Sequence, residues 1–123
     1  MDKNEFNLRM DQMKSLLADE KFDEAAEIAD TINWNKIKNA TTLLKIGEVY
    51  EKAGRYADSK EVLLAAFDRS PIGRGILYRL AEVAIKMNDI NLAKEYYDEF
   101  VSIAPHDNLK YVLRYNILKA QGA

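Results

Sequence analysis

Residues 51–67, EKAGRYADSKEVLLAAF, contain the end of one helical pattern, a glycine and the start of a second pattern. Glycine adopts a left-handed backbone at no steric cost, so Gly54 suits the position just after a helix. Beyond the turn, apolar residues from Val62 to Phe67 lie along one side of a helix. The stretch therefore predicts two helices joined by a tight turn.

This turn recurs along the chain at a constant interval. Positions 22, 56 and 90 hold large side chains and positions 25, 59 and 93 hold small ones, so both series advance in steps of 34 residues. Pro71 and Pro105 keep the same step. A fixed period of this length is typical of repeat proteins, in which stacked units bury one continuous core. We expect three blocks at about 6–39, 40–73 and 74–107.

Each block has the periodicity of two amphipathic helices. In the middle block Leu43, Ile46 and Tyr50 share one face of the first helix with Gly47. The small side chains at Gly47 and Ser59 are predicted to let the two helices approach closely. A short connection between them makes the pair antiparallel.

In order and spacing these residues resemble the tetratricopeptide repeat. That family's unit has a large residue, a Leu-Gly pair, a Tyr, a Gly-x-Tyr turn, an alanine and a closing proline. The middle block matches this pattern at Leu43, Ile46, Gly47, Tyr50, Gly54, Tyr56, Ser59, Ala66 and Pro71. The third block corresponds to it at Leu77, Leu80, Ala81, Ala84, Asn88, Ile90, Ala93, Phe100 and Pro105. The first block is degenerate at Arg9, Gln12 and Met13, as a terminal repeat is expected to be.

The resemblance implies an all-α fold, a right-handed α-solenoid of antiparallel helix-turn-helix repeats with about seven helices. We expect a single domain over residues 1–123, or part of a longer chain, that ends in a helix at about 107–120. That helix shows little polar surface, whereas a capping helix should present a polar face to water. Two explanations stay open: a homodimer partner covers residues 109–118, or the natural protein continues past Ala123.

Composition argues against several classes of function. The chain has 18 basic and 20 acidic residues and a formal charge of -2, so no overall field favours nucleic acid. It has no cysteine, and its one histidine, His106, is predicted to be a surface residue of a corner. Neither a metal site nor a nucleophile–base pair can be assembled from this inventory. We therefore expect neither enzymatic activity nor a cofactor.

The expected location is cytoplasmic. The first residues are charged throughout and hold no apolar stretch of signal-peptide length. The longest apolar run, Val62 to Phe67, is far shorter than a membrane span, so no membrane contact is expected from this segment. Trp34 and the basic run from Lys36 to Lys38 fall between the first and second blocks, where the indole is predicted to pack in the core rather than to anchor a partner.

In this family the first helix of each repeat lines the concave face. The resemblance places the following residues on that face: Met10, Lys14, Leu17, Leu44, Lys45, Glu48, Tyr78, Arg79, Glu82, Ile85, Val112, Leu113 and Asn116. Apolar anchors beside Lys14, Lys45 and Arg79 suit a peptide with apolar and acidic residues, and an ordinary solvated face is the alternative. The family's carboxylate clamp for chaperone tails is not supported, because only Arg79 matches its five positions.

These observations predict a non-catalytic scaffold that binds a peptide or a partner protein along its concave face. One alternative is a homo-oligomerisation module that associates through the apolar terminal helix. The other is the repeat region of a larger regulatory protein.

Overall fold

The computed structural model describes residues 1–122, and the last residue of the predicted domain, at position 123, lies outside the described part. Within that part the chain forms seven α-helices and one short 3-10 helix. Their bounds are α1 (Lys3–Ala18), α2 (Phe22–Asp30), η1 (Trp34–Lys36), α3 (Ala40–Lys52), α4 (Tyr56–Arg69), α5 (Arg74–Lys86), α6 (Ile90–Ile103) and α7 (Leu109–Gly122).

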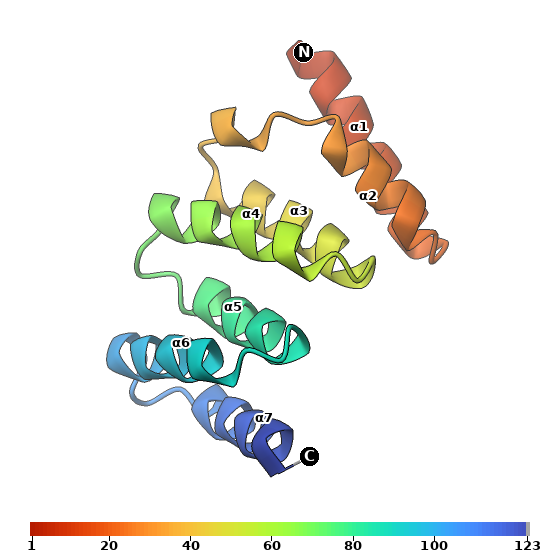
Figure 1. Cartoon of the computed structure of the whole chain (residues 1–123). Helices are drawn as coiled ribbons and strands as arrows, with labels where there is room; N and C mark the ends of the chain where they lie inside the picture. The colour runs from red at the N-terminus through yellow and green to blue at the C-terminus, as the bar shows by residue number, and fades with distance from the viewer. Residues whose placement is uncertain (123) are drawn as a thin grey trace.

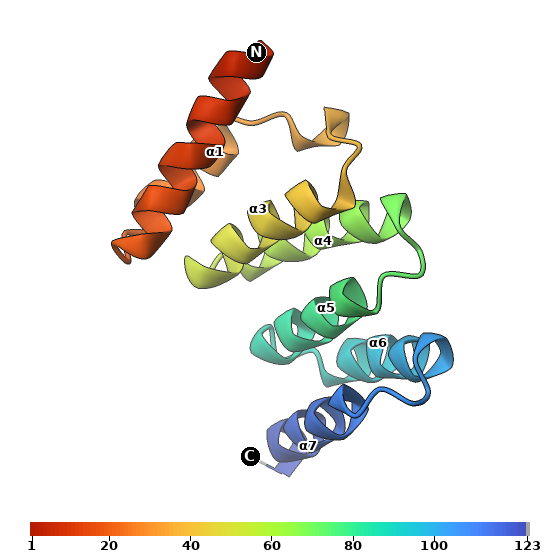
Figure 2. The same ribbon diagram turned by 180° about the vertical axis from the view of Figure 1, so that it is seen from behind.

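The helices pack as successive antiparallel pairs that stack in chain order (Figure 1). The two ends of the chain lie at opposite ends of the stack, and α7 adds a single helix after the third pair (Figure 1). Seen from behind, α1, α3, α5 and α7 follow one another along the molecule (Figure 2). The predicted all-α solenoid is confirmed. Across residues 1–122, no helix combines the length and apolar character needed to cross a bilayer.

The three predicted corners share one backbone geometry. Glu20, Gly54 and Asn88 have φ values of 58°, 75° and 60°, and they are the residues of the described chain with positive φ. After each of them an N–H closes the helix end, for example Arg55 N to Tyr50 O at 2.9 Å and Asp89 N to Ala84 O at 2.9 Å. This is the Schellman type of helix end. The corner is therefore repeated in all three pairs although glycine occupies it only once.

The pair α3–α4 is held closely by two small residues. A Cβ added to Gly47 would lie 2.7 Å from Leu63 Cδ2, so the leucine fills the space that a side chain would need. The Ser59 hydroxyl is fully buried and donates to the Gly47 carbonyl at 2.7 Å. The predicted close approach at these two residues is confirmed.

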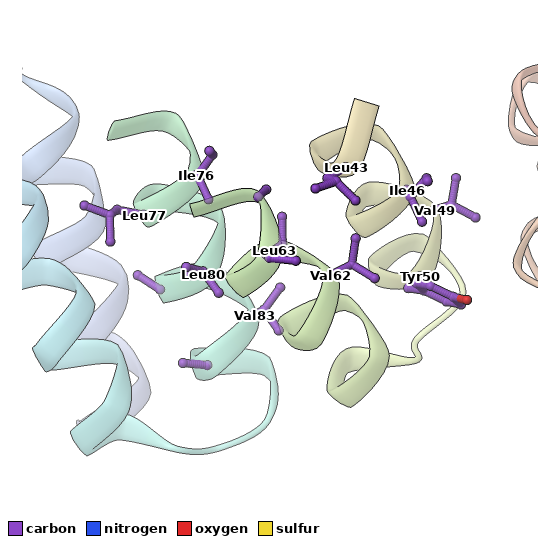
Figure 3. Packing of buried hydrophobic residues seen from close by; sticks show 14 of the residues in the cluster. Leu43, Ile46, Val49, Tyr50, Val62, Leu63, Ile76, Leu77, Leu80 and Val83 are labelled. Carbon is purple, nitrogen blue, oxygen red and sulfur yellow. The ribbon is translucent and has the colours of Figure 1, made fainter. Parts of the chain in front are cut away.

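Helix α4 connects the core of its own pair with that of the next. Val62 and Leu63 lie between the apolar side chains of α3 and those of α5 (Figure 3). Each of these two side chains is 1% exposed. At the end of the stack, the buried Leu113 and Ile117 join α7 to the same core. No pair of helices could bury its apolar faces alone, so stacking is the source of stability.

The joint between the first and second pairs departs from the regular repeat. Helix α2 has 9 residues, whereas α4 and α6 have 14. The chain from Asp30 to α3 then runs through residues 31–39 and includes η1, while α4 and α5 are joined by residues 70–73. Arg69 holds this connection by donating to the carbonyls of Asn35 and Ile37 at 3.0 and 3.2 Å.

A charged network also crosses this joint. Arg55 donates to both carboxylate oxygens of Asp30 at 2.8 Å and to Asp58 at 2.9 Å. The Tyr50 hydroxyl donates to Asp30 at 2.9 Å, and the Arg55 guanidinium lies 4.9 Å from the centre of the Tyr50 ring. The hydrogen bonds from Arg55 hold the pKa of Asp30 below its ordinary value of 3.8. The end of α2 is thereby tied to the corner between α3 and α4.

Two glycine substitutions should have opposite effects on stability. Gly54→Ala places a Cβ in open space but keeps φ at 75°, so we expect a loss of about 1 kcal/mol from backbone strain alone. Gly75→Ala also meets open space, and Gly75 lies in the first turn of α5, so we expect a gain below about 1 kcal/mol from helix propensity. Urea unfolding of both variants measures the difference, and a change of the same sign in both would contradict the corner geometry.

Candidate peptide-binding surface

The residues predicted for the concave face lie on α1, α3, α5 and α7, and all but one reach the surface at least in part. Lys14, Lys45 and Val112 are exposed, and the other reaching residues are half-buried. Leu113 is the exception. It is 0% exposed and belongs to the core, so its place in the predicted surface was wrong. The reason is that α7 turns Leu113, together with Ile117, toward the preceding pair.

A buried carboxylate between α3 and α5 changes what Arg79 can do. The Glu51 side chain is 8% exposed and pairs with Lys86 Nζ at 2.6 Å and with Arg79 Nη1 at 3.7 Å. Its Oε1 atom is buried without a hydrogen-bond partner. The charge of Arg79 is therefore partly balanced by a carboxylate of the protein itself, although no hydrogen bond joins the two groups. Sequence reasoning missed Glu51, which reads as one more polar residue of an amphipathic helix.

The charge of Glu51 also changes the pKa of the nearby Glu82. Burial raises the pKa of its carboxyl above the ordinary value of 4.5, and the charge of Glu51 raises it further. Arg79 and Lys86 oppose these effects without cancelling them. The charges of Arg79, Glu82 and Lys86 on α5 are therefore partly balanced by one another and by Glu51.

Tyr78 is fixed by packing rather than standing free on the surface. Its ring meets that of Phe100 edge to face, with centroids 6.2 Å apart and an interplanar angle of 60°. Burial raises the pKa of the Tyr78 hydroxyl. A ring held in this way offers a partner a rigid edge at little further cost in side-chain entropy.

Three of the predicted residues line one cavity between α5 and α7. The cavity has a volume of about 340 Å³ and is bordered by Glu82, Ile85, Lys86, Asn116, Lys119 and Ala120. It combines an apolar wall with acidic, basic and amide groups. Such a mixture can bind a side chain while fixing its orientation.

Apart from Val112 on α7, the remaining predicted residues come from α1 and α3. Met10, Leu17 and Leu44 pack partly against the core, whereas Lys14 and Lys45 extend into solvent. Neither lysine takes part in an ion pair among residues 1–122. These two lysines are therefore the basic groups of the predicted surface that can meet an acidic partner directly.

Two other predicted residues take simpler positions. Trp34 is half-buried and packs against the core, as predicted. His106 is exposed at the corner before α7, also as predicted. Throughout the described chain, 1–122, no group of three or more His, Cys, Asp or Glu side chains is arranged to hold a metal ion.

Comparison with known families adds to this geometry. A family model described as "Tetratricopeptide repeat" matches residues 40–72 and 75–107, which contain the helix pairs α3–α4 and α5–α6. The first helix pair lies outside both matches. A search of curated proteins found no match to the chain.

Solved structures with similar folds cover nearly the whole chain. SycD, a type III secretion translocator chaperone of Yersinia enterocolitica, has a TM-score of 0.74 and 8% identity over 98% of this chain and 86% of its own. PcrH in complex with the chaperone binding region of PopD has a TM-score of 0.69 and 13% identity over 99% and 90%. The first TPR of Spaghetti (RPAP3), bound to the HSP90 peptide SRMEEVD, has a TM-score of 0.73 and 13% identity over 100% and 98%. At these identities the likeness concerns the fold.

The raised pKa of Glu82 predicts a pH-dependent effect of the variant Glu82→Gln. A carboxyl whose pKa is higher in the folded state contributes stability below its unfolded value, and this contribution is lost as pH rises through the folded value. The difference in unfolding free energy between Glu82→Gln and wild type should therefore shift in favour of the variant as the pH rises from 4 to 7. Urea unfolding at the two pH values measures it, and an equal effect at both would show that burial does not disfavour the ionised carboxylate.

Proposed function

Because the chain belongs to the tetratricopeptide repeat family, we propose that it is a non-catalytic scaffold that binds a peptide or partner protein on the face formed by α1, α3, α5 and α7. The observation that carries this proposal is the presence of exposed, unpaired Lys14 and Lys45 beside the half-buried apolar Leu17 and Leu44. An acidic group of a partner would meet the lysines while its apolar side chains cover the leucines.

The relatives in fold support a binding role of this kind. PcrH holds a region of PopD, and Spaghetti holds an HSP90 peptide. The partner of the present chain is expected to differ from an acidic chaperone tail, because only Arg79 matches the five positions of the family's carboxylate clamp. A partner with separate acidic and apolar residues fits the groups that are free.

We also retain the proposed organisation and location. The chain is a single domain with repeats at about 6–39, 40–73 and 74–107, a division supported by the helix bounds and by the two family-model matches. We also propose a cytoplasmic location; the absence of cysteine is compatible with a reducing compartment and also with an exported bacterial protein.

Exchange of the two free lysines tests the binding surface. We expect Lys14→Glu/Lys45→Glu to reduce the retention of acidic, apolar members of a random peptide library by about tenfold or more, because two charge-assisted contacts become repulsive. Both lysines are exposed, so the fold should persist, which circular dichroism checks. Arg79 is left unchanged because its replacement by Glu would place another carboxylate beside Glu51.

The matched control carries the same charge change on the second helices of the repeats. Lys60→Glu/Lys94→Glu alters α4 and α6, and neither lysine takes part in an ion pair of the described residues. Retention by this control should equal that of wild type. If Lys14→Glu/Lys45→Glu retains the peptides as well as wild type does, the face formed by α1 and α3 is not the binding surface.

Self-association through α7 is a second candidate function. Its exposed side includes Tyr111, Val112, Tyr115 and Leu118, with 60%, 47%, 64% and 55% of their surface accessible. Single exposed apolar residues are common, but a contiguous set on one helix is typical of an interface. A second copy that covers residues 109–118 would bury this set, and so would a further segment in a larger regulatory protein.

Light scattering over a range of protein concentrations distinguishes these arrangements. Self-association predicts a mass that rises toward twice the monomer value, and Tyr115→Glu should restore the monomer because a charge cannot be buried unpaired. A matched change at an exposed site on another helix, Leu64→Glu on α4, should leave the dimer intact. A monomer at every concentration would contradict self-association of this chain.

A further inference from the structure

A cavity of about 750 Å³ lies at the first joint, away from the surface described above. It is bordered by the start of α1, by the connection between α2 and α3, and by the first turn of α3. None of the residues predicted for the concave face borders it. We call this cavity the first-joint pocket.

The pocket exists because α2 ends early. In an antiparallel pair the last turn of the second helix lies beside the first turn of the first helix. Helix α2 stops at Asp30, five residues short of the length of α4 and α6, so that last turn is missing. The chain leaves instead through Thr31, whose hydroxyl donates to the Ile28 carbonyl at 2.6 Å, and continues into η1. The start of α1 is left with an open flank.

The walls of the pocket are held in place from both sides. Arg69 of α4 donates to the carbonyls of Asn35 and Ile37, on the connection that borders the pocket. Arg9 of α1 donates to the Thr31 carbonyl at 3.3 Å. Three backbone carbonyls of the connection are thus bonded to arginines on neighbouring helices. A pocket that is formed before binding costs a ligand little ordering entropy.

The chemistry of the pocket is apolar inside and basic at its rim. Ile32 is 5% exposed, and Phe6 and Ile37 pack partly against the core. At the rim, Lys3, Lys36 and Lys38 are exposed and take no part in an ion pair among residues 1–122.

The rim contains one carboxylate, and it is already used. Asp2 caps α1, where its Oδ1 accepts from the Glu5 N–H at 2.8 Å. Three lysines and one aspartate give the rim a positive charge, although the whole chain has a formal charge of -2. The rim is therefore locally basic in a chain whose net charge is negative.

We propose that the first-joint pocket binds a peptide segment in which acidic residues adjoin large apolar residues. The apolar side chains lie against Phe6, Ile32 and Ile37, and the carboxylates meet the lysines of the rim. Thr31, Asn33 and Thr42 also border the pocket and add hydroxyl and amide groups to its lining. A nucleic acid fits less well, because a few lysines in a chain of net negative charge do not attract a phosphate backbone.

A defined peptide tests the pocket without knowledge of the natural partner. The probe is the capped tetrapeptide Leu-Glu-Phe-Glu, and two matched peptides replace either both Glu by Gln or both apolar residues by Ser. Trp34 is the only tryptophan of the chain and lies in η1 beside the pocket, so its emission reports binding at this place. We expect the probe to shift Trp34 emission, and both matched peptides to need about tenfold or more higher concentration for the same shift.

Variants of the protein separate this site from the α1/α3 face. Measured by the shift of Trp34 emission, Lys36→Glu/Lys38→Glu should weaken the probe by about tenfold or more, whereas Lys14→Glu/Lys45→Glu should leave the affinity obtained from this signal within about twofold. The two double variants change the net charge equally, so a general field effect would act on both.

Three results would overturn the inference. The first is binding of the Gln peptide as tight as that of the probe, and the second is an equal loss in the Lys14/Lys45 variant. The third is displacement of the probe by hexanoate at the same concentration, which would make the pocket a site for free carboxylic acids. The proposed function of the other face is tested separately, by the retention of a random peptide library on Lys14→Glu/Lys45→Glu and on its control Lys60→Glu/Lys94→Glu.

Discussion

The contact between Leu63 and Gly47 is the constraint on which the remaining packing depends. An added Cβ at position 47 would lie 2.7 Å from Leu63 Cδ2, so any larger residue there would force Leu63 to move. Helix α4 can then present Val62 and Leu63 to both neighbouring helices, and the α3–α4 pair becomes part of a continuous core (Figure 3). Because each pair is stable only through its neighbours, one close contact in the middle of the stack supports the arrangement of the whole chain.

Charged groups between repeats decide which side chains are free for a partner. Glu51 engages Lys86 and faces Arg79, so the basic groups of α5 balance a charge within the protein. Lys14 and Lys45 have no such neighbour in the described chain. The distribution of pairing therefore shifts the expected binding surface toward α1 and α3, although the family pattern alone gives Arg79 equal weight.

The first joint illustrates how a repeat protein gains a feature by losing regularity. The shortened α2 and the η1 connection leave a flank of α1 open, and Arg69 and Arg9 hold the new path in place. The network of Asp30, Arg55 and Tyr50 compensates for the missing turn by tying the end of α2 to the next corner. Stability and an additional cavity thus arise from the same departure.

The sequence by itself determined the repeat, its three corners and the close approach of α3 and α4 at Gly47 and Ser59. The 34-residue period and the backbone preferences of the turn residues are properties of the sequence alone. It also indicated the helices that carry the candidate surface. The tertiary structure alone decided that Leu113 is buried, that Glu51 pairs with Lys86 and faces Arg79, and that a cavity opens beside Phe6. These outcomes depend on which residues of different repeats meet, and an amphipathic pattern records only which face of one helix avoids water.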